Sequence, residues 1–403
     1  MRKINLSDFT VATTETVRDI NSRIVLNLVR KHQPLSRADL MRHSGLQRST
    51  VSAIAERLIA ERWLKEGATG NLPRGRKPTF LHLNAERCAV LGVDVQPGTT
   101  TLAVASLDAT VLAQESMPTP KEPSEFIARV CRRIKDLLRA HPKNAYEGVG
   151  ISLPGRIDAV SGRLVFAPTL GWKDLDLKTP IENAIGLAVK LENAANACAL
   201  AELWSGHHTE GVGNVVAVTV SDDIGVGMIM NGQLVRGSSG LAGEFGHVVQ
   251  MPNGPVCRCG NSGCWEALAS NAAAVRYYAE ATSVPKGEIG SKSDMVTVPF
   301  TDILRLVEQG DPKARRALNR MAHHLGAGLA MLAAGLAPDV LVVIGEVTRA
   351  WGMVEPVVTT AVRRRLSSRS SIRIFAGDSA LQPRLRGIIA LVLQKHFVAP
   401  AIA

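Results

Sequence analysis

Residues 214–237 read NVVAVTVSDDIGVGMIMNGQLVRG, and this stretch sets the expectation for the fold. Two runs of small and β-branched residues flank a Ser-Asp-Asp turn, and Met230-Asn231-Gly232 supplies a second turn. Such runs, separated by turn residues, are typical of strands joined as hairpins. The stretch therefore predicts a β-rich start to one unit of the chain.

A second β-rich start lies near residue 88, where two strand-like runs are joined by a Leu107-Asp108-Ala109 turn. Further apolar runs alternate with helical segments: GVGISLP at 148–154, LAVKLEN at 187–193 and DVLVVIGE at 339–346, with a helix over 124–140. This alternation indicates an α/β protein. The two similar starts predict two similar lobes with a cleft between them, and a single large Rossmann-like sheet is the alternative.

Composition bounds the class of protein. A chain of 403 residues exceeds one ordinary core, so two or three domains are expected. Its 46% hydrophobic and 21% charged residues are typical of a soluble globular protein. Because no signal peptide follows Met1 and no apolar run of about 18 residues occurs, we expect a cytoplasmic protein with no membrane partner.

The positive charge gathers at one end of the chain. Residues 1–83 hold 15 Lys and Arg against 7 Asp and Glu, a net +8 of the total +11. This distribution is typical of a nucleic-acid-binding module attached to a nearly neutral body. A merely solvated basic surface is the alternative.

Three helices are expected before residue 64. The first, over 18–31, places Ile20, Ile24, Val25 and Leu28 on one apolar face. The second, SRADLMRHS at 36–44, opens with a capping box of Ser36 and Asp39, and Gly45 supplies the turn that follows. The third, over 47–63, turns Val51, Ile54, Leu58 and Ile59 inward.

The first turn of the third helix carries polar side chains of the kinds that contact base edges and phosphates in the major groove. These candidate DNA contacts are Gln47, Arg48, Ser49, Thr50 and Ser52. The next stretch, LKEGATGNLPRGRKPTFLHL, predicts a hairpin wing whose tip places Arg74, Arg76 and Lys77 at a minor groove. We therefore expect a winged helix-turn-helix that binds double-stranded DNA, and a generic helical hairpin is the alternative.

Four segments after the winged region carry a family resemblance: GISLPGRIDAVSGRL (150–164), LENAANACALAE (191–202), GMIMNGQLVRGSSGLAGEFGHV (227–248) and CRCGNSGCWEALAS (257–270). Together they closely resemble the ROK family, which groups bacterial sugar-responsive repressors and sugar kinases. The resemblance covers essentially the whole chain. It implies an actin-like two-lobed fold, a sugar site in the cleft, and dimers or tetramers that bind a pseudo-palindromic DNA operator.

The expected domains follow from this reading. Residues 15–83 form the winged helix-turn-helix, 84–200 form lobe 1 together with a C-terminal helix over 380–398, and 201–379 form lobe 2 with a zinc loop over 247–266. The function implied is a sugar-responsive transcriptional regulator, a repressor of carbohydrate genes. The alternatives are a sugar kinase that carries a DNA-binding domain, and a zinc-stabilised scaffold with an empty cleft.

Three of the six cysteines lie within eight positions, whereas Cys88, Cys131 and Cys198 are scattered in apolar or helical surroundings. In a reducing cytoplasm such a cluster favours metal binding or redox chemistry over structural disulfides. The candidate ligands are His247, Cys257, Cys259 and Cys264, a closed Cys₃His set of the structural zinc type. A redox pair is the alternative.

By resemblance, Asn193, Glu244, His247 and Glu266 line the sugar site, because carboxylates and amides hydrogen-bond vicinal hydroxyls. The alternative is that the carboxylates cap helices or pair with lysines. In kinases of the family the base is an aspartate directly after the matching asparagine, and this chain has Ala194 there. Glu192 is no substitute, since adjacent side chains on a strand point to opposite sides.

The phosphate-binding turns also depart from the kinases. Where those have Asp-x-Gly-Gly-Thr, this chain has Gln96 and Pro97, and Pro97 has no N–H donor. Glu346 occupies the place of a usual glycine, and two acids open the SDDIGVG stretch at 221–227. We therefore expect neither ATP as a cofactor nor enzymatic activity.

Overall fold

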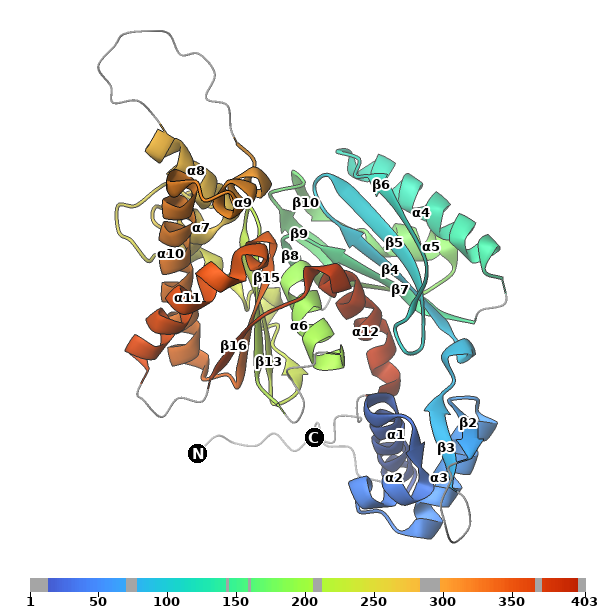
Figure 1. Ribbon diagram of the computed structural model, residues 1–403. Helices are drawn as coiled ribbons and strands as arrows, with labels where there is room; N and C mark the ends of the chain where they lie inside the picture. Colours follow the sequence, from blue (N-terminus) through green and yellow to red (C-terminus); the bar gives the residue numbers. More distant parts are fainter. Residues whose placement is uncertain are drawn as a thin grey trace, which may run out of the picture.

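The computed structural model describes residues 14–69, 78–142, 145–158, 161–205, 212–282, 298–366 and 372–397. Figure 1 shows three parts: a small N-terminal unit, and two lobes each built on a five-stranded sheet. Two helices, α6 (Ala194–Ser205) and α12 (Pro383–Phe397), lie between the lobes. The alternation of strands and helices confirms the predicted two-lobed α/β fold.

The N-terminal unit packs three helices on a three-stranded antiparallel sheet of order β1-β3-β2. Its elements are α1 (Thr14–His32), β1 (Leu35–Ser36), α2 (Arg37–Ser44), α3 (Arg48–Ala60), β2 (Leu64–Thr69) and β3 (Thr79–Leu83). The Ser36 hydroxyl accepts from Asp39 N while Asp39 accepts from Ser36 N, which confirms the predicted capping box. Gly45 ends α2 at φ +70°.

The buried face of α1 differs from the prediction. Val25, Leu26 and Val29 are buried, whereas Ile24 is 39% exposed. Positions i, i+1 and i+4 of this set lie within an arc of about 100° around the helix, and Ile24 lies about 100° outside that arc. The prediction for Ile24 was wrong because the apolar residues of this helix cover a broad face, and the sequence alone does not determine which part of that face packs on the core.

Lobe 1 contains a sheet of order β11-β7-β4-β5-β6. Its larger elements are β4 (Ala89–Val95), β5 (Thr99–Ser106), β6 (Val111–Pro118), α4 (Pro123–Ala140), β7 (Tyr146–Leu153), α5 (Lys178–Ile185) and β11 (Val189–Asn193). A small three-stranded sheet sits beside it, formed by β8 (Arg156–Asp158), β9 (Arg163–Ala167) and β10 (Trp172–Leu175). The helix η2 (Ala85–Arg87) leads in from the N-terminal unit.

Lobe 2 contains a sheet of order β14-β13-β12-β15-β16. Its strands are β12 (Val215–Val220), β13 (Ile224–Met230), β14 (Gln233–Leu234), β15 (Val340–Gly345) and β16 (Arg373–Ala376). Its α-helices are α7 (Trp265–Ala269), α8 (Asn271–Thr282), α9 (Phe300–Glu308), α10 (Pro312–Leu336) and α11 (Trp351–Arg365). Its 3₁₀ helices are η3 (Ser238–Gly240), η4 (Glu244–His247), η5 (Glu346–Ala350) and η6 (Ser379–Leu381).

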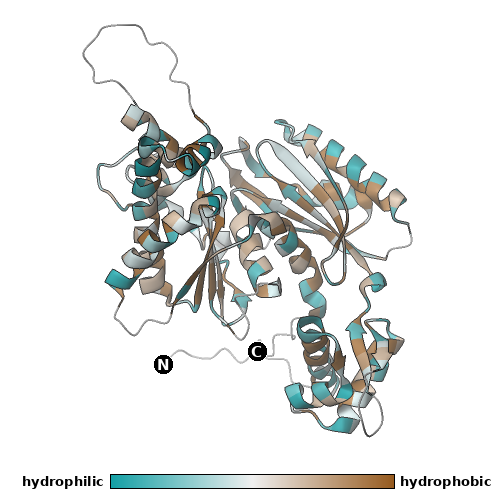
Figure 2. Cartoon of the chain, viewed as in Figure 1, coloured by the Kyte–Doolittle hydropathy of each residue, from teal (hydrophilic) through white to brown (hydrophobic). Residues whose placement is uncertain are grey.

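The two large sheets share one topology. In each, the central strand pairs antiparallel on one side with the next strand of a meander, and that strand pairs antiparallel with the edge strand. On its other side the central strand pairs parallel with a later strand, which pairs parallel with the opposite edge strand. Figure 2 shows both sheets as mainly hydrophobic, in keeping with their burial between layers. Two copies of one plan exclude the single Rossmann-like sheet.

The helices α6 (Ala194–Ser205) and α12 (Pro383–Phe397) are exchanged between the lobes. α6 directly follows β11 of lobe 1 but packs on β12 and β13 of lobe 2. α12 comes after β16 of lobe 2 but packs on β4 and β7 of lobe 1. The two helices also pack on each other, so they join the lobes behind the cleft.

Candidate metal centre and inter-lobe cleft

A cleft of about 780 Å³ opens between the two lobes. Lobe 1 contributes the β4–β5 turn, the Pro154-Gly155 turn and the start of α6, while lobe 2 contributes the β12–β13 turn and η4. The predicted cleft residues Asn193, Glu244, His247 and Glu266 all line it. The fold thus brings together side chains from positions 73 residues apart.

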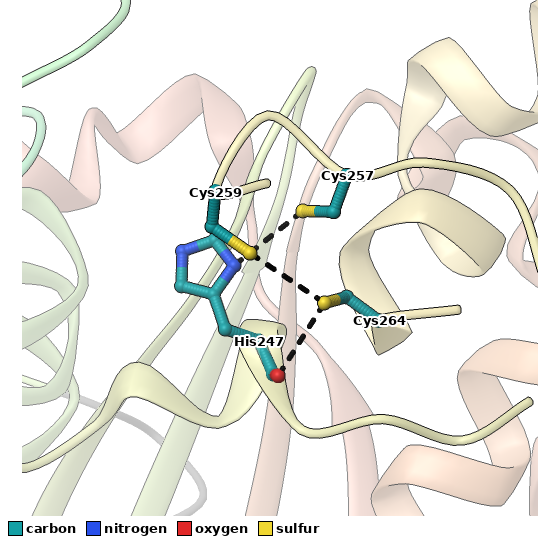
Figure 3. Close-up of side chains that lie close together, drawn as sticks. All are labelled: His247, Cys257, Cys259 and Cys264. Carbon is teal, nitrogen blue, oxygen red and sulfur yellow. Dashed lines mark hydrogen bonds between the residues drawn. The ribbon is translucent and has the colours of Figure 1, made fainter. Parts of the chain in front are cut away.

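His247, Cys257, Cys259 and Cys264 form a compact cluster at the wall of this cleft, and their ligand atoms all lie within 4.8 Å of one another. Figure 3 shows the three sulfurs and the imidazole Nδ1 converging on one point. The Cys257 Sγ lies 3.6 Å from His247 Nδ1, and the Cys259 Sγ lies 3.6 Å from the Cys264 Sγ. The predicted ligand set is therefore assembled in space.

The loop that carries the cysteines is shaped by backbone contacts. Gly263 has φ +73°, and a Cβ there would lie 1.7 Å from the Met251 carbonyl oxygen. Gly263 N donates to Pro255 O, and Trp265 N donates to Val248 O at 2.9 Å. Only glycine can satisfy both the left-handed conformation and the close approach, so Gly263 sets the path of the loop.

The donor set fits a structural zinc ion. With Zn–S bonds of about 2.3 Å, two sulfurs of a tetrahedral site lie about 3.8 Å apart, close to the observed spacing. Three thiolates and one imidazole complete four coordination positions, so the set leaves none for a substrate. Burial raises the pKa of the Cys257 thiol to about 12, so a metal ion is what would hold this sulfur as a thiolate.

The same histidine connects the cluster to the cleft. While Nδ1 of His247 faces Cys257, its Nε2 lies 3.6 Å from a carboxylate oxygen of Glu244. Glu266 is buried and accepts from Ile224 N at 3.3 Å. Burial raises the pKa of the Glu266 carboxyl, an effect that the neighbouring His247 opposes. Ordering the loop therefore orders both carboxylates at the cleft.

Asn193 ends β11, and its side-chain oxygen accepts from Asn196 N at 2.7 Å, which caps α6. This leaves the amide N–H groups of Asn193 for a ligand in the cleft. Glu192 is absent from the residues that line the cleft. Its buried carboxylate instead pairs with Arg236 at 2.8 Å and accepts from Asn196 Nδ2 at 2.9 Å.

The cleft also contains the residues that depart from the kinase pattern. Ala194, Gln96 and Pro97 line the lobe 1 side, and Gln96 Nε2 donates to Asp94 at 2.8 Å. Glu346 and the two acids Asp222 and Asp223 line the lobe 2 side. These three acids disfavour a triphosphate next to the lobe 2 side of the cleft.

The ROK family model matches residues 90–395, which is most of the chain. The chain belongs to the ROK family. A xylose repressor of Bacillus spizizenii is 30% identical over 362 residues, 89% of each chain.

Two solved structures are similar to this ROK protein. A ROK family transcriptional regulator, described as a homolog of the E. coli MLC protein, aligns with a TM-score of 0.78 and 24% identity, covering 95% of this chain and 98% of its own. A ROK family glucokinase from Streptomyces griseus, solved with glucose and AMPPNP, aligns with a TM-score of 0.65 and 28% identity. The alignment covers 75% of this chain and 98% of the glucokinase. The first likeness supports the fold over almost the full length.

Three arginines of this ROK protein also line the cleft, and sequence patterns did not single them out. Arg156 follows the Pro154-Gly155 turn, Arg258 lies between two candidate metal ligands, and Arg384 lies in the first turn of α12. The Thr169 side chain lines the cleft as well, and its buried Oγ1 has no hydrogen-bond partner. These residues come from separate elements, so only the fold brings them together.

The candidate DNA contacts of the ROK protein lie at the start of α3. Gln47, Arg48 and Ser49 are exposed, and Thr50 and Ser52 are half-buried. Arg74, Arg76 and Lys77 lie outside the described residues. No helix of the described part is long and apolar enough to cross a membrane.

Proposed function

We propose that this ROK protein is a sugar-responsive, DNA-binding transcriptional repressor of carbohydrate genes. The observation that carries the proposal is the match to the xylose repressor, which spans 89% of both chains and therefore extends beyond the region of the family model. The basic N-terminal unit and the polar cleft give the two binding surfaces that such a protein needs.

Residues 15–83 are the proposed winged helix-turn-helix. The exposed start of α3 is the element that enters the major groove, through Gln47, Arg48 and Ser49 with Thr50 and Ser52 beside them. Arg74, Arg76 and Lys77 supply minor-groove and phosphate contacts. Binding as a dimer or tetramer places two such units on the half-sites of a pseudo-palindromic operator.

The proposed sugar site contains Asn193, Glu244, His247 and Glu266, held by a structural zinc ion on His247, Cys257, Cys259 and Cys264. Lobe 1 is proposed to span 84–200 with helix 380–398, and lobe 2 to span 201–379. A sugar that contacts both lobes favours a closed arrangement, which changes the spacing of the paired DNA-binding units.

The test is a footprint of the purified protein on the DNA upstream of its own gene, with and without pentoses, hexoses and N-acetylhexosamines. We expect protection of a pseudo-palindrome that one of these sugars relieves. Replacing Glu244 by glutamine should abolish the relief and leave the protection intact, while the exposed turn variant Asn231→Ala should behave as wild type.

The kinase alternative is tested on the same preparation with labelled ATP and the same sugars. The Ala194 methyl group cannot take the hydroxyl proton as the aspartate of the family's kinases does, and Glu346 and Pro97 disfavour the phosphates. We therefore expect no sugar phosphate above background. Protection that no sugar affects, together with sugar phosphorylation, would replace the repressor proposal by the kinase.

A further inference from the structure

Both exchanged helices run from the cleft to the N-terminal unit. The first residues of α6, Ala194 and Ala195, line the cleft, and so does Arg384 at the start of α12. At the opposite ends, the rings of Trp204 and Phe397 meet edge to face, with centroids 5.0 Å apart. Figure 1 shows α12 ending beside α1.

One side chain of the N-terminal unit contacts both helix ends. The Arg30 guanidinium of α1 lies 4.2 Å from the Trp204 ring centroid and 5.7 Å from that of Phe397. Its Nη1 donates to the Trp204 carbonyl at 2.5 Å, and the neighbouring Asn27 amide donates to the Phe397 carbonyl. Burial lowers the pKa of Arg30 to about 10, which leaves it charged at neutral pH.

A second set of contacts fixes α12 to the same unit and to lobe 1. The centroid of the Trp63 ring lies 4.6 Å from the centroid of the His396 ring and 3.5 Å from Cζ of the Arg87 guanidinium. Glu147 of β7 accepts from Lys395 at 2.8 Å and lies 2.9 Å from His396 Nε2. The N-terminal unit is therefore attached to the end of α12 on one side and to the end of α6 on the other.

The two helices touch backbone to backbone in between. A Cβ at Gly387 of α12 would lie 1.6 Å from the Ala197 carbonyl oxygen of α6, so only glycine permits this approach. Each helix is also packed on a different lobe. A rotation of one lobe relative to the other must therefore pivot the two helices about this contact.

We propose that α6 and α12 form a relay that transmits the state of the cleft to the DNA-binding unit, with the Arg30–Trp204–Phe397 contact as its output. The inference rests on the proposed function for its biological meaning. A ligand that binds Asn193 and draws the lobes together changes the angle between the helices. The distance between Trp204 and Phe397 then changes, and Arg30, which contacts both, repositions α1.

The first experiment needs neither sugar nor DNA. Asn193→Ala removes the side chain that caps α6 at the cleft end. Asp311→Ala is the control, because the Asp311 carboxylate caps α10 in the same way and accepts from Ala314 N at 2.6 Å. Loss of one cap should speed exchange in the capped helix roughly fivefold. Hydrogen exchange by mass spectrometry should then show faster exchange in residues 23–32 for Asn193→Ala and unchanged exchange there for Asp311→Ala.

The second experiment measures the output contact in the full-length protein. Arg30→Ala and Arg30→Lys are compared with Arg18→Ala, an exposed arginine on the same helix. Fluorescence anisotropy gives the affinity for the upstream DNA with and without D-xylose, D-glucose or N-acetylglucosamine. We expect the sugar effect on DNA affinity to fall at least fivefold in Arg30→Ala, to fall less in Arg30→Lys, and to persist in Arg18→Ala.

The two experiments separate the possible failures. The relay is wrong if Asn193→Ala speeds exchange in α6 alone. It is also wrong if Arg30→Ala still binds DNA and sugar and keeps the full sugar effect on DNA affinity. Either result would leave the repressor proposal standing. Coupled exchange in the first experiment, with no sugar acting on wild-type DNA binding, would support the relay and contradict the proposed function.

Discussion

Lobe 1 and lobe 2 are built on the same five-stranded sheet, but the connection that follows the meander is much longer in lobe 2. Four residues separate β6 from α4 in lobe 1, whereas thirty separate β14 from α7 in lobe 2. The longer connection contains Glu244 and all four candidate metal ligands, and Glu266 follows it directly. The sheets are thus the common scaffold, and one insertion gives lobe 2 its chemistry.

The insertion has very little core of its own. Its small buried cluster consists of Cys257 and Cys264 packed with Ala267 of α7, while Val249 and Val256 are 47% and 77% exposed. A segment that buries so little apolar surface needs another source of order, which a metal ion supplies. The comparison therefore predicts that lobe 2 depends on metal and lobe 1 does not.

Cys259→Ser is the most damaging change expected. Cys259 is exposed, so the substitution costs little packing but removes one of four metal ligands. We expect zinc content to fall from one ion per chain to near zero, sugar binding to weaken at least a hundredfold, and the 248–264 loop to become sensitive to protease. Metal analysis, calorimetry and limited proteolysis measure these effects.

The matched control is Cys131→Ser on α4 of lobe 1, which should retain one zinc ion per chain. A full complement of zinc in Cys259→Ser would show that the ligand set is wrong. Normal sugar binding by a zinc-free protein would break the assignment of metal dependence to lobe 2.

Arg236→Ala tests the connection between the lobes. Arg236 of lobe 2 pairs with Glu192 of lobe 1, whose side chain is only 6% exposed. Removing the arginine leaves a buried carboxylate unpaired, and we expect a loss of about 2–3 kcal/mol in the free energy of unfolding, measured with urea. The exposed pair of Arg163 and Asp174 is the control, since Arg163→Ala should cost about 0.5 kcal/mol or less.

If the loss comes from the unpaired carboxylate, adding Glu192→Gln to Arg236→Ala should recover part of it. Equal stability of Arg236→Ala and wild type would instead mean that the lobes hold together without this pair.

Glu147→Gln tests the attachment of lobe 1 to α12. Burial disfavours the Glu147 carboxylate, but hydrogen bonds from Lys395 and His396 prevail and lower its pKa to about 2. A depressed pKa contributes stability above about pH 4.5 that is lost as the pH falls toward 2. We expect Glu147→Gln to lower the free energy of unfolding by about 1–2 kcal/mol at pH 7. The stability of the variant should also fall less between pH 7 and pH 3 than that of wild type, as measured by thermal unfolding at both pH values.

The exposed pair of Glu125 and Arg129 on α4 provides the control, and Glu125→Gln should leave both the stability and its acid dependence near wild type. An unchanged acid dependence in Glu147→Gln would place the responsible carboxylate elsewhere in the protein.

Ala194→Asp should have the smallest effect. It restores the family's catalytic base next to Asn193, but Pro97 and Glu346 still line the phosphate side of the cleft. We expect no ATP-dependent sugar phosphorylation above the wild-type background, measured by transfer of labelled phosphate. Measurable turnover would show that the phosphate-binding turns of both lobes are intact.

The sequence predicted what is determined locally. The capping box at Ser36, the turn at Gly45 and the strands of both hairpins depend on neighbouring residues, and the structure contains them. The metal cluster was also accessible, because its ligands share one motif. Glu192 lies outside the cleft lining as predicted, since alternation along a strand requires no tertiary information.

Features that depend on distant segments were not accessible. The packing of α6 on the sheet of lobe 2 was missed, because nothing in residues 194–205 shows which sheet their apolar face will meet. The pairing of Glu192 with Arg236 bridges 44 positions, and Arg384 reaches the cleft from α12, 191 positions after Asn193. The exposed flank of α1 at Ile24 has the same origin, because the core that selects the buried stripe forms only in the tertiary structure.

The exchange of α6 and α12 also sets the order in which a newly made chain can be completed. The strands of lobe 1 lie within residues 89–193, yet the helix that packs on β4 and β7 lies at 383–397. Domains usually fold as they leave the ribosome, but lobe 1 has to wait until residues 383–397 have been synthesised. The N-terminal unit packs on the same helix, so a chain released before residue 383 would lack both the complete lobe 1 and the surface on which the N-terminal unit packs.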